Sequence, residues 1–212
     1  MSDHRSTPDQ AWRSPRAWAT FAGTLAGAAA LDLATKWLAF ERIAGAPVRI
    51  DRREVLAAFP RLSDLIPPHQ PVTVVPGLLD LTLVLNPGAV FGVGAGKRWF
   101  FIAFTLIVCA AGVGAFAKWT RARDAWTHVA LGLILGGGLG NLYDRLVFAC
   151  VRDFLHPLPG LTLPFGWSWP WGGREVWPYV SNGADLFLIV GVAIIAVKSW
   201  RSAPPGAQRP AA

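Results

Sequence analysis

The chain has 212 residues, of which 53% are hydrophobic and only 16% are charged, and its mean hydropathy is +0.38. This balance excludes an ordinary soluble globular domain and is typical of a membrane protein. The net charge of +7 does not indicate nucleic-acid binding, because the basic residues flank apolar segments and form no patch interleaved with aromatic residues. We therefore expect membrane lipids as partners, anionic headgroups in particular, and no nucleic acid.

Four apolar segments are close to the roughly 20 residues that a helix needs to cross a bilayer. They cover about 18–40, 98–117, 126–148 and 180–200. The sequence therefore predicts an all-α membrane protein with four transmembrane helices, which together form one domain over 18–200. Residues 1–17 and 201–212 are polar or rich in proline and alanine, and this composition predicts two disordered cytoplasmic tails.

The connection between the first two predicted helices contains a strand signal. In the segment VTVVPGLLDLTLVLN, residues 72–86, leucines occupy every second position from 79 to 85. A period of two predicts β-strands with one face packed and one face exposed. We therefore expect a small extracytoplasmic β element at about 72–92, lying at the membrane surface.

Two other connections indicate how the chain is oriented. The short segment between the second and third predicted helices carries Lys118, Arg121 and Arg123, and short basic segments are retained in the cytoplasm. This favours an N-terminus and a C-terminus that are both cytoplasmic. Residues 156–178 are rich in proline, glycine and tryptophan, which excludes a regular helix and predicts an outer loop resting on the membrane interface.

Polar residues within the predicted spans converge at one membrane depth. An ionisable side chain inside the bilayer costs at least ~2.5 kcal/mol, so each one needs a partner or a function. Because successive spans run in opposite directions, the polar ends of three spans, the last strand residue and one loop aspartate fall on the same side. These residues are Asp32, Lys36, Asn86, Asn141, Asp144, Arg145, Asp153, Asn182 and Asp185. We expect them to form one polar cluster.

A structural explanation is available for part of this cluster. Asp32 and Lys36 are four residues apart and can pair on one helix face, and Asp144 can pair with Arg145 or with a base on a neighbouring helix. Asn182 and Asp185, three positions apart, also have the spacing of an N-terminal capping box.

Asp153 and Asp185 differ because neither has an evident cationic partner at helical spacing, although Arg152 is adjacent to Asp153. Two carboxylates that lie close together cannot both ionise cheaply, so they share a proton. This is the chemistry of aspartic proteases, in which one carboxylate activates water and the other protonates the carbonyl oxygen. We expect no metal and no cofactor, because the histidines are scattered and no set of ligands accompanies the two aspartates.

Five glycines lie in the third predicted span, at 132, 136, 137, 138 and 140. Small residues let helices approach closely in a membrane. The glycines have two interpretations at this point: plain tight packing, or close helix contacts around a laterally open cleft. Cys109 and Cys150 lie in apolar surroundings without ligand spacing, and we interpret both as small buried hydrophobic residues rather than as a disulfide.

Five short blocks of the sequence occur in a recognisable order. They are DLATK (32–36), NPGAVFG (86–92), GNLYDR (140–145), VRDF (151–154) and SNGAD (181–185). In these blocks the chain resembles the lipoprotein signal peptidases, also called signal peptidase II, which are aspartic intramembrane proteases of bacteria. The resemblance extends over about residues 18–200.

The resemblance implies roles for individual residues. Asp153 and Asp185 match the catalytic aspartates of the family, whereas Asp144 matches an aspartate that supports the site. Further residues that are expected to bind substrate or support the site are Asn86, Asn141, Arg145, Asn182, Asp32 and Lys36. The helix dipole favours ionised Asp185 as the initial base, and desolvation near lipid favours protonated Asp153 as the initial acid.

The resemblance also implies the reaction and its place in the cell. We expect a monomeric enzyme of the bacterial inner membrane, with its active site facing the periplasm. It would remove the signal peptide from diacylglyceryl-modified prolipoproteins by cleaving before the lipidated cysteine. Ser181, where the family usually has phenylalanine, and the long loop 156–178 depart from the family pattern and concern substrate preference.

Two functions of other classes also account for a set of membrane helices. A small membrane transporter would cluster intramembrane carboxylates, but near the midplane and in broken helices with repeat symmetry, which the sequence does not contain. A non-catalytic membrane scaffold would need no carboxylates at positions 153 and 185. Both stay open as alternatives.

Overall fold

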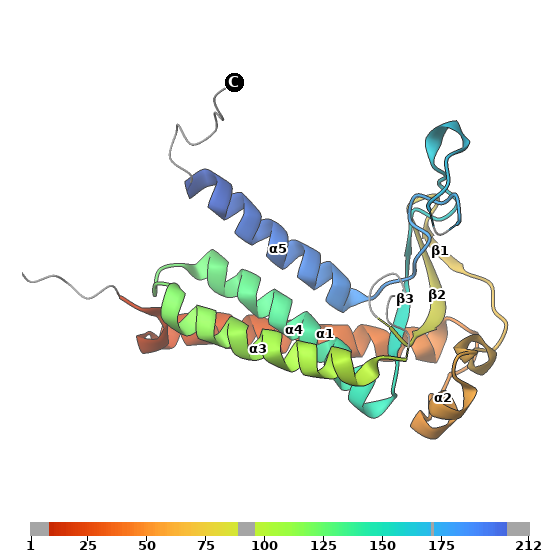
Figure 1. Cartoon of the computed structure of the whole chain (residues 1–212), viewed down its shortest axis with the longest axis horizontal. Coiled ribbons are helices and arrows are strands. Elements are labelled where there is room, and N and C mark those ends of the chain that lie inside the picture. Colours follow the sequence, from red (N-terminus) through yellow and green to blue (C-terminus); the bar gives the residue numbers. More distant parts are fainter. Residues whose placement is uncertain (1–8, 89–95, 171, 203–212) are drawn as a thin grey trace, which may run out of the picture.

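The computed structural model of the protein describes residues 9–88, 96–170 and 172–202 (Figure 1). Its main part consists of four long helices, α1 (Pro15–Arg42), α3 (Arg98–Trp119), α4 (Ala125–Val147) and α5 (Gly183–Ser202). Helix α4 is in contact with each of the other three. Figure 1 shows α1, α3 and α4 side by side, α5 inclined to them, and a small β-sheet standing across one end of the helices.

Three of the helices are long and apolar enough to cross a membrane, namely α1, α3 and α5. These three candidate spans coincide with the segments predicted near 18–40, 98–117 and 180–200, and the chain is a mostly helical membrane protein. The predicted span near 126–148 is a helix of 23 residues, α4, but it is not among the apolar candidates within the described part of the chain.

The ends of the helical region differ from the predicted boundaries. Helix α1 begins at Pro15, where the Ser14 hydroxyl accepts a hydrogen bond from the Ala17 amide. Residues 11–13, which we expected to belong to a disordered tail, instead form a 3-10 turn (η1, Ala11–Arg13) in which Ala11 is buried and its amide donates to the Thr120 carbonyl. The rest of the predicted tails, 1–8 and 203–212, lies outside the described residues.

The sheet has three antiparallel strands in the order β1 (Val72–Val75), β2 (Leu79–Asn86) and β3 (Val151–Pro157). Strands β1 and β2 confirm the strand signal, while residues 89–92 of the predicted element lie outside the described residues. Strand β3 was not predicted. Its pairing places Asp153 opposite Val84 and Val151 opposite Asn86, so the end of β2 and the VRDF block lie next to each other.

An apolar core attaches the sheet to the end of α1. Its buried members come from α1, from the short helix α2 (Arg52–Ala58) and from strands β2 and β3, and they include Phe40, Val55, Leu83, Leu85 and Phe154. A 3-10 turn, η2 (Leu62–Leu65), also contributes Leu62. This packing holds the sheet in a fixed position relative to the helix that carries Asp32 and Lys36.

Connections outside these elements are short or irregular. Residues 156–178 continue from β3 into a loop that contains a 3-10 turn, η4 (Pro164–Gly166), and a bridge between Thr162 and Glu175.

Cys150 is buried directly before β3, and burial raises the pKa of its thiol to about 12, which makes it unreactive. Cys109 is only partly buried, and both cysteines are free.

Glycines of α4 lie where neighbouring helices touch it. A Cβ atom added at Gly132 or Gly136 would meet the backbone of α1, and one added at Gly137 would meet the Ala184 carbonyl of α5. One added at Gly140 would overlap the Asp32 carboxylate, whereas Gly138 has space. Four of the five glycines are therefore required for close helix contact.

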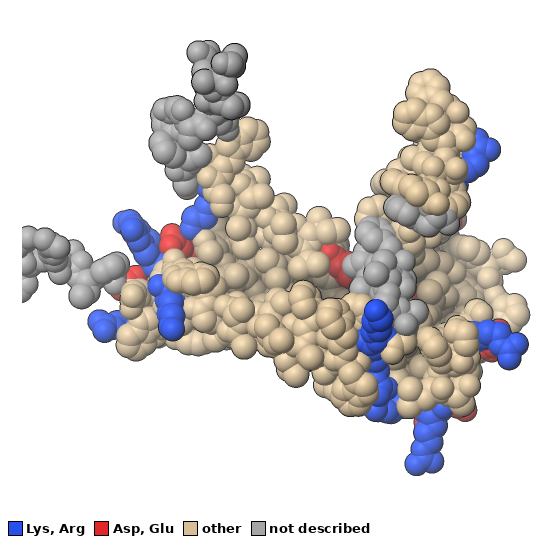
Figure 2. Space-filling model, viewed as in Figure 1, with Lys and Arg blue, Asp and Glu red and all other residues tan. Residues whose placement is uncertain are grey.

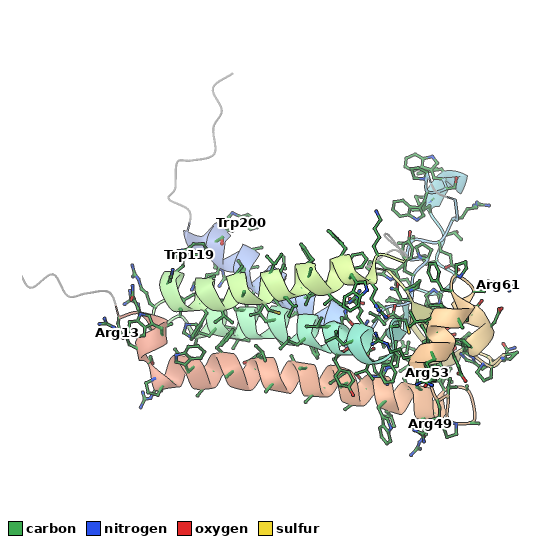
Figure 3. All side chains as sticks on the ribbon, turned by 60° about the horizontal axis from the view of Figure 1, so that its bottom comes forward. Arg13, Arg49, Arg53, Arg61, Trp119 and Trp200 are labelled. Carbon is green, nitrogen blue, oxygen red and sulfur yellow. The ribbon has the colours of Figure 1, made fainter. Side chains whose placement is uncertain are left out.

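Charge is concentrated at the two ends of the helical bundle. Figure 2 shows most Lys and Arg side chains at these ends and a wide, mainly uncharged surface between them. In Figure 3, Arg13, Trp119 and Trp200 lie at one end, and arginines of the α2 region lie at the end that carries the sheet. This distribution is typical of a protein whose middle faces lipid.

Candidate active site

The polar residues predicted to converge are joined in one network at the sheet end of the bundle. Its first part is ionic. The Lys36 ammonium lies 2.7 Å from Asp32 Oδ2 and 3.5 Å from Asp144 Oδ2, and all three side chains are fully buried. The pair of Asp32 and Lys36 at i,i+4 is therefore present as the spacing suggested.

Asp144 has a second cationic partner that sequence spacing did not identify. It forms an ion pair with Arg152, whose Nη2 lies 2.8 Å from Asp144 Oδ1, and it also accepts a hydrogen bond from the Arg152 amide at 3.0 Å. The predicted pairing with Arg145 is not formed, because adjacent residues on a helix point in different directions. The alternative, a base from another element, is correct, and that element is β3.

Asp153 is held by amide groups. Asn182 Nδ2 donates to its Oδ1 at 2.6 Å, and Asn86 Nδ2 donates to its Oδ2 at 3.0 Å. The side chain is buried, with a relative exposure of 1%. Burial raises the pKa of Asp153 to about 7, and the Asp185 carboxylate adds to the rise, although the two amide hydrogen bonds oppose it.

Asp185 lies in the first turn of α5 and takes part in a capping box. Its Oδ2 accepts from the Asn182 amide at 3.2 Å, and Asn182 Oδ1 in turn accepts from the Asp185 amide at 3.3 Å. The capping interpretation is thus correct for the backbone. The same carboxylate also faces the site, because Asn141 Nδ2 lies 3.5 Å from its Oδ1.

Asparagines connect the ionic part to the two remaining aspartates. Asn182 contacts both Asp153 and Asp185, and Asn141 lies between Asp185 and Lys36, whose ammonium donates to Asn141 Oδ1 at 2.7 Å. Among the described residues, no cation forms an ion pair with Asp153 or Asp185. The Asp153 and Asp185 carboxylates interact electrostatically, and whether they share one proton stays a prediction.

Arg145 borders the network on the side of α3. Its guanidinium donates to the Gly88 carbonyl at 2.8 Å and to the Asn141 carbonyl at 3.2 Å, and it lies 5.3 Å from the centre of the Phe101 ring. Arg145 therefore ties α4 to Gly88, two residues after the end of β2. All nine predicted residues take part in these contacts.

Two contacts of this region could not be read from the sequence. The Ala184 amide donates to Asp32 Oδ1 at 2.8 Å, and this bond fixes the start of α5 against α1. Ser181 exchanges backbone hydrogen bonds with Leu155, so β3 and the start of α5 are tied together. No cluster of metal ligands was found in the part of the chain that the structure describes.

Comparison with known proteins identifies the family of the chain. A family model described as signal peptidase (SPase) II matches residues 24–201. A lipoprotein signal peptidase of Desulfitobacterium hafniense is 39% identical over 127 residues, which are 59% of this chain and 72% of the relative. One of Bifidobacterium longum subsp. infantis is 32% identical over 165 residues, which are 78% of this chain and 80% of the relative.

A solved structure shares the fold. It is a bacterial membrane enzyme determined by the in meso method at 2.3 Å resolution, with a TM-score of 0.61 and 23% identity. The match covers 91% of this chain and 94% of that one. The family match extends over most of the chain and includes the blocks that carry the polar network, and the resemblance seen in the sequence is confirmed. The chain belongs to the signal peptidase II family.

Proposed function

We propose that the protein is an aspartic endopeptidase that removes the signal peptide from diacylglyceryl-modified prolipoproteins. Cleavage takes place before the lipidated cysteine. The observation that carries this proposal is the pair of Asp153, which is buried, and Asp185, which is partly buried. The two carboxylates interact electrostatically and receive hydrogen bonds from amides, and within the described residues neither forms an ion pair with a cation. The relatives that this chain matches are named lipoprotein signal peptidases, which supplies the substrate class.

The two aspartates divide the chemistry. A pKa near 7 keeps a large share of Asp153 protonated at neutral pH, so Asp153 donates a proton to the carbonyl oxygen of the scissile bond. Asp185, in the first turn of α5, accepts a proton from a water molecule, and the resulting hydroxide adds to the carbonyl carbon. Asp153 then takes back a proton from the tetrahedral intermediate, and Asp185 protonates the leaving nitrogen.

The surrounding residues orient this pair. Asn86 and Asn182 fix the Asp153 carboxyl group, and Asn141 orients Asp185 while being fixed by Lys36. Arg145 and the strand end at Asn86 border the space in which the substrate backbone would bind. Asp32, Lys36 and Asp144 support the site by holding α1, α4 and β3 together.

The proposed orientation places this site at the periplasmic face of the bacterial inner membrane. Helix α4 crosses the bilayer with α1, α3 and α5, and both termini are cytoplasmic. The sheet and the loop 156–178 then lie outside, where the tryptophans of the loop rest on the interface. The protein acts as a monomer, and the substrate enters sideways from the lipid.

Cleavage of a purified prolipoprotein tests the proposal. The wild type should cleave a diacylglyceryl-modified substrate and leave the same substrate without lipid intact, and mass spectrometry should find the lipidated cysteine at the new N-terminus. Asp153→Asn and Asp185→Asn should each reduce the rate at least ~1,000-fold, because the pair acts as a unit. A chelator should have no effect.

The matched control is Asp64→Asn, which changes an exposed carboxylate at the same end of the molecule. It should cleave like the wild type. Retention of full activity by either site variant would contradict the proposal, as would cleavage at a different bond.

A further inference from the structure

A groove of about 640 Å³ lies between the second half of α5 and the first turn of α4. Its wall on α5 consists of apolar side chains, among them Ile189, Ala193, Ile194 and Val197. Arg201 at its rim follows Asp185 by sixteen helical residues, which is about 24 Å along the axis. The groove is therefore separate from the candidate active site and lies toward the opposite end of the bundle.

The rim of the groove is basic. It includes Arg123, Lys198 and Arg201 together with one carboxylate, Asp124. Lys198 forms an ion pair with Asp124 at 3.1 Å, so these two charges neutralise each other. No carboxylate among the described residues pairs with Arg123 or Arg201. The rim therefore carries two uncompensated positive charges next to an apolar wall.

Aromatic residues mark the membrane level of this rim. Trp119 and Trp200 are 84% and 75% exposed, and they lie near Arg13 at this end of the bundle (Figure 3). Exposed tryptophans favour the headgroup region of a bilayer. The cations of the rim thus lie at headgroup level, while the apolar wall extends from them toward the hydrocarbon core.

We propose that this groove binds one anionic glycerophospholipid from the leaflet at this end, which is the cytoplasmic leaflet in the proposed orientation. One acyl chain lies along the apolar wall of α5, and the phosphate contacts Arg123 and Arg201. The groove also includes the first residues of α4, Ala125 and Trp126, where the helix dipole favours an anion. The volume is in the range of sites that hold small ligands, roughly 300–1,000 Å³.

Charge distinguishes this occupant from others. A second copy of the chain would bring two basic rims together, which is unfavourable without an anion between them. A zwitterionic lipid would gain less from the two arginines than a lipid with net negative charge, because its own cation opposes them. An anionic lipid can pack its acyl chain on the apolar wall while its phosphate pairs with the basic rim. It would also bridge α4 and α5 where α5 is inclined away from α4 (Figure 1).

Native mass spectrometry of the full chain tests this inference. The detergent-solubilised protein is mixed with equal amounts of phosphatidylglycerol and phosphatidylcholine that have identical acyl chains. The wild type should retain phosphatidylglycerol preferentially. The double variant Arg123→Gln/Arg201→Gln should lose about 30-fold of this preference, as expected for two cations near a lipid phosphate. Ala193→Trp, which fills the apolar wall, should lower retention of the bound lipid itself.

The matched control is Arg53→Gln/Arg61→Gln, which makes the same change in net charge at the other end of the bundle and should keep the preference. Thermal melts establish that every variant is folded. Equal retention of the two lipids by the wild type, an equal loss in the control, or no effect of Ala193→Trp would overturn the inference. Displacement of the lipid by soluble glycerol phosphate would also overturn it, because a phosphate site alone would then account for binding.

Discussion

The carboxylates of the polar network at the sheet end fall into two groups that differ in their partners. Asp32 and Asp144 each contact Lys36, and Asp144 also pairs with Arg152. Asp153 and Asp185 instead receive hydrogen bonds from asparagines and backbone amides. All four carboxylates belong to the same polar network, but within the described residues only those of the first group form ion pairs.

We infer from this difference that the ion-paired aspartates stabilise the fold and that the amide-held aspartates carry out the reaction. Asp153, which is buried and held by neutral amides, has its pKa raised to about 7, so it can exchange a proton near neutral pH. The ionic group connects α1, α4 and β3, so its loss should affect folding. The amide-held group is joined by hydrogen bonds without ion pairs, so its loss should affect the reaction more than the fold. The following variants test this division, from the largest expected effect on stability to the smallest.

Asp144→Asn should give the largest loss of stability. Arg152 and Lys36 would keep their buried charges without the compensating carboxylate, and breaking one partner of a buried pair costs about 3–5 kcal/mol. Thermal melting in detergent measures this effect. Asp124→Asn is the control, since its pair with Lys198 is partly exposed and should contribute at most about 1 kcal/mol. Equal melting points for the two variants would contradict the supporting role of Asp144.

Asp153→Asn should raise stability, in a way that depends on pH. The pKa of Asp153 is about 7 in the folded protein and 3.8 in an unperturbed chain, so from about pH 4 to 7 the unfolded state is ionised while the folded state holds its proton. The stability of the wild type therefore falls as pH rises through this range. The variant lacks this loss. Its free energy of unfolding should therefore exceed that of the wild type by roughly 2–4 kcal/mol at pH 8, and the difference should vanish at pH 4.

Melts of both proteins at pH 4, 6 and 8 provide the measurement. A difference that stays constant with pH would mean that Asp153 titrates normally in the folded protein.

Gly140→Ala should destabilise by about 1–3 kcal/mol, because the added methyl group would overlap the Asp32 carboxylate and force α1 and α4 apart. Gly138→Ala is a close control in the same helix, since its Cβ would lie 3.7 Å from Thr105 Cγ2. That variant should be neutral or slightly stabilised, because alanine is the better helix former. A loss of the same size at both positions would show that the fit around Asp32 is not the cause.

Asn86→Ala should have the smallest effect on stability and a measurable effect on cleavage. It removes one hydrogen bond to the Asp153 carboxylate, so the pKa of Asp153 should rise further. The alkaline limb of the pH–rate profile should move to higher pH, and the rate at neutral pH should fall about tenfold. Thr82→Val, on the same strand but bonded to His69, should leave the profile unchanged. An unmoved limb in Asn86→Ala would contradict the assignment of Asp153 as the acid.

Much of the architecture could be predicted because it is local in sequence. The length of the apolar segments predicts α1, α3 and α5, and the alternation of leucines predicts β2. The spacing of Asp32 and Lys36 predicts their pairing. Strand β3 could not be predicted in this way, because its partner β2 is more than sixty residues away and the pairing is decided by tertiary structure. The partner of Asp144 is missed for the same reason, since Arg152 reaches it only after β3 has formed.

The polar network illustrates the same limit. Alternating spans place its members at one depth, and this argument is sufficient to bring Asp153 and Asp185 to one end. Depth alone does not give lateral order, so the role of Asn182 as the neighbour of both aspartates follows only from the capping box and the bridge between Leu155 and Ser181.

The most direct test of the division is to measure cleavage and thermal melting on the same preparations of Asp185→Asn and Asp144→Asn, each beside the wild type. Asp185→Asn is expected to lose cleavage while its melting point stays within a few degrees of the wild type. Asp144→Asn is expected to melt well below both. If Asp185→Asn still cleaves the lipid-modified prolipoprotein, or if it melts as low as Asp144→Asn, then the amide-held aspartates are not the reacting pair.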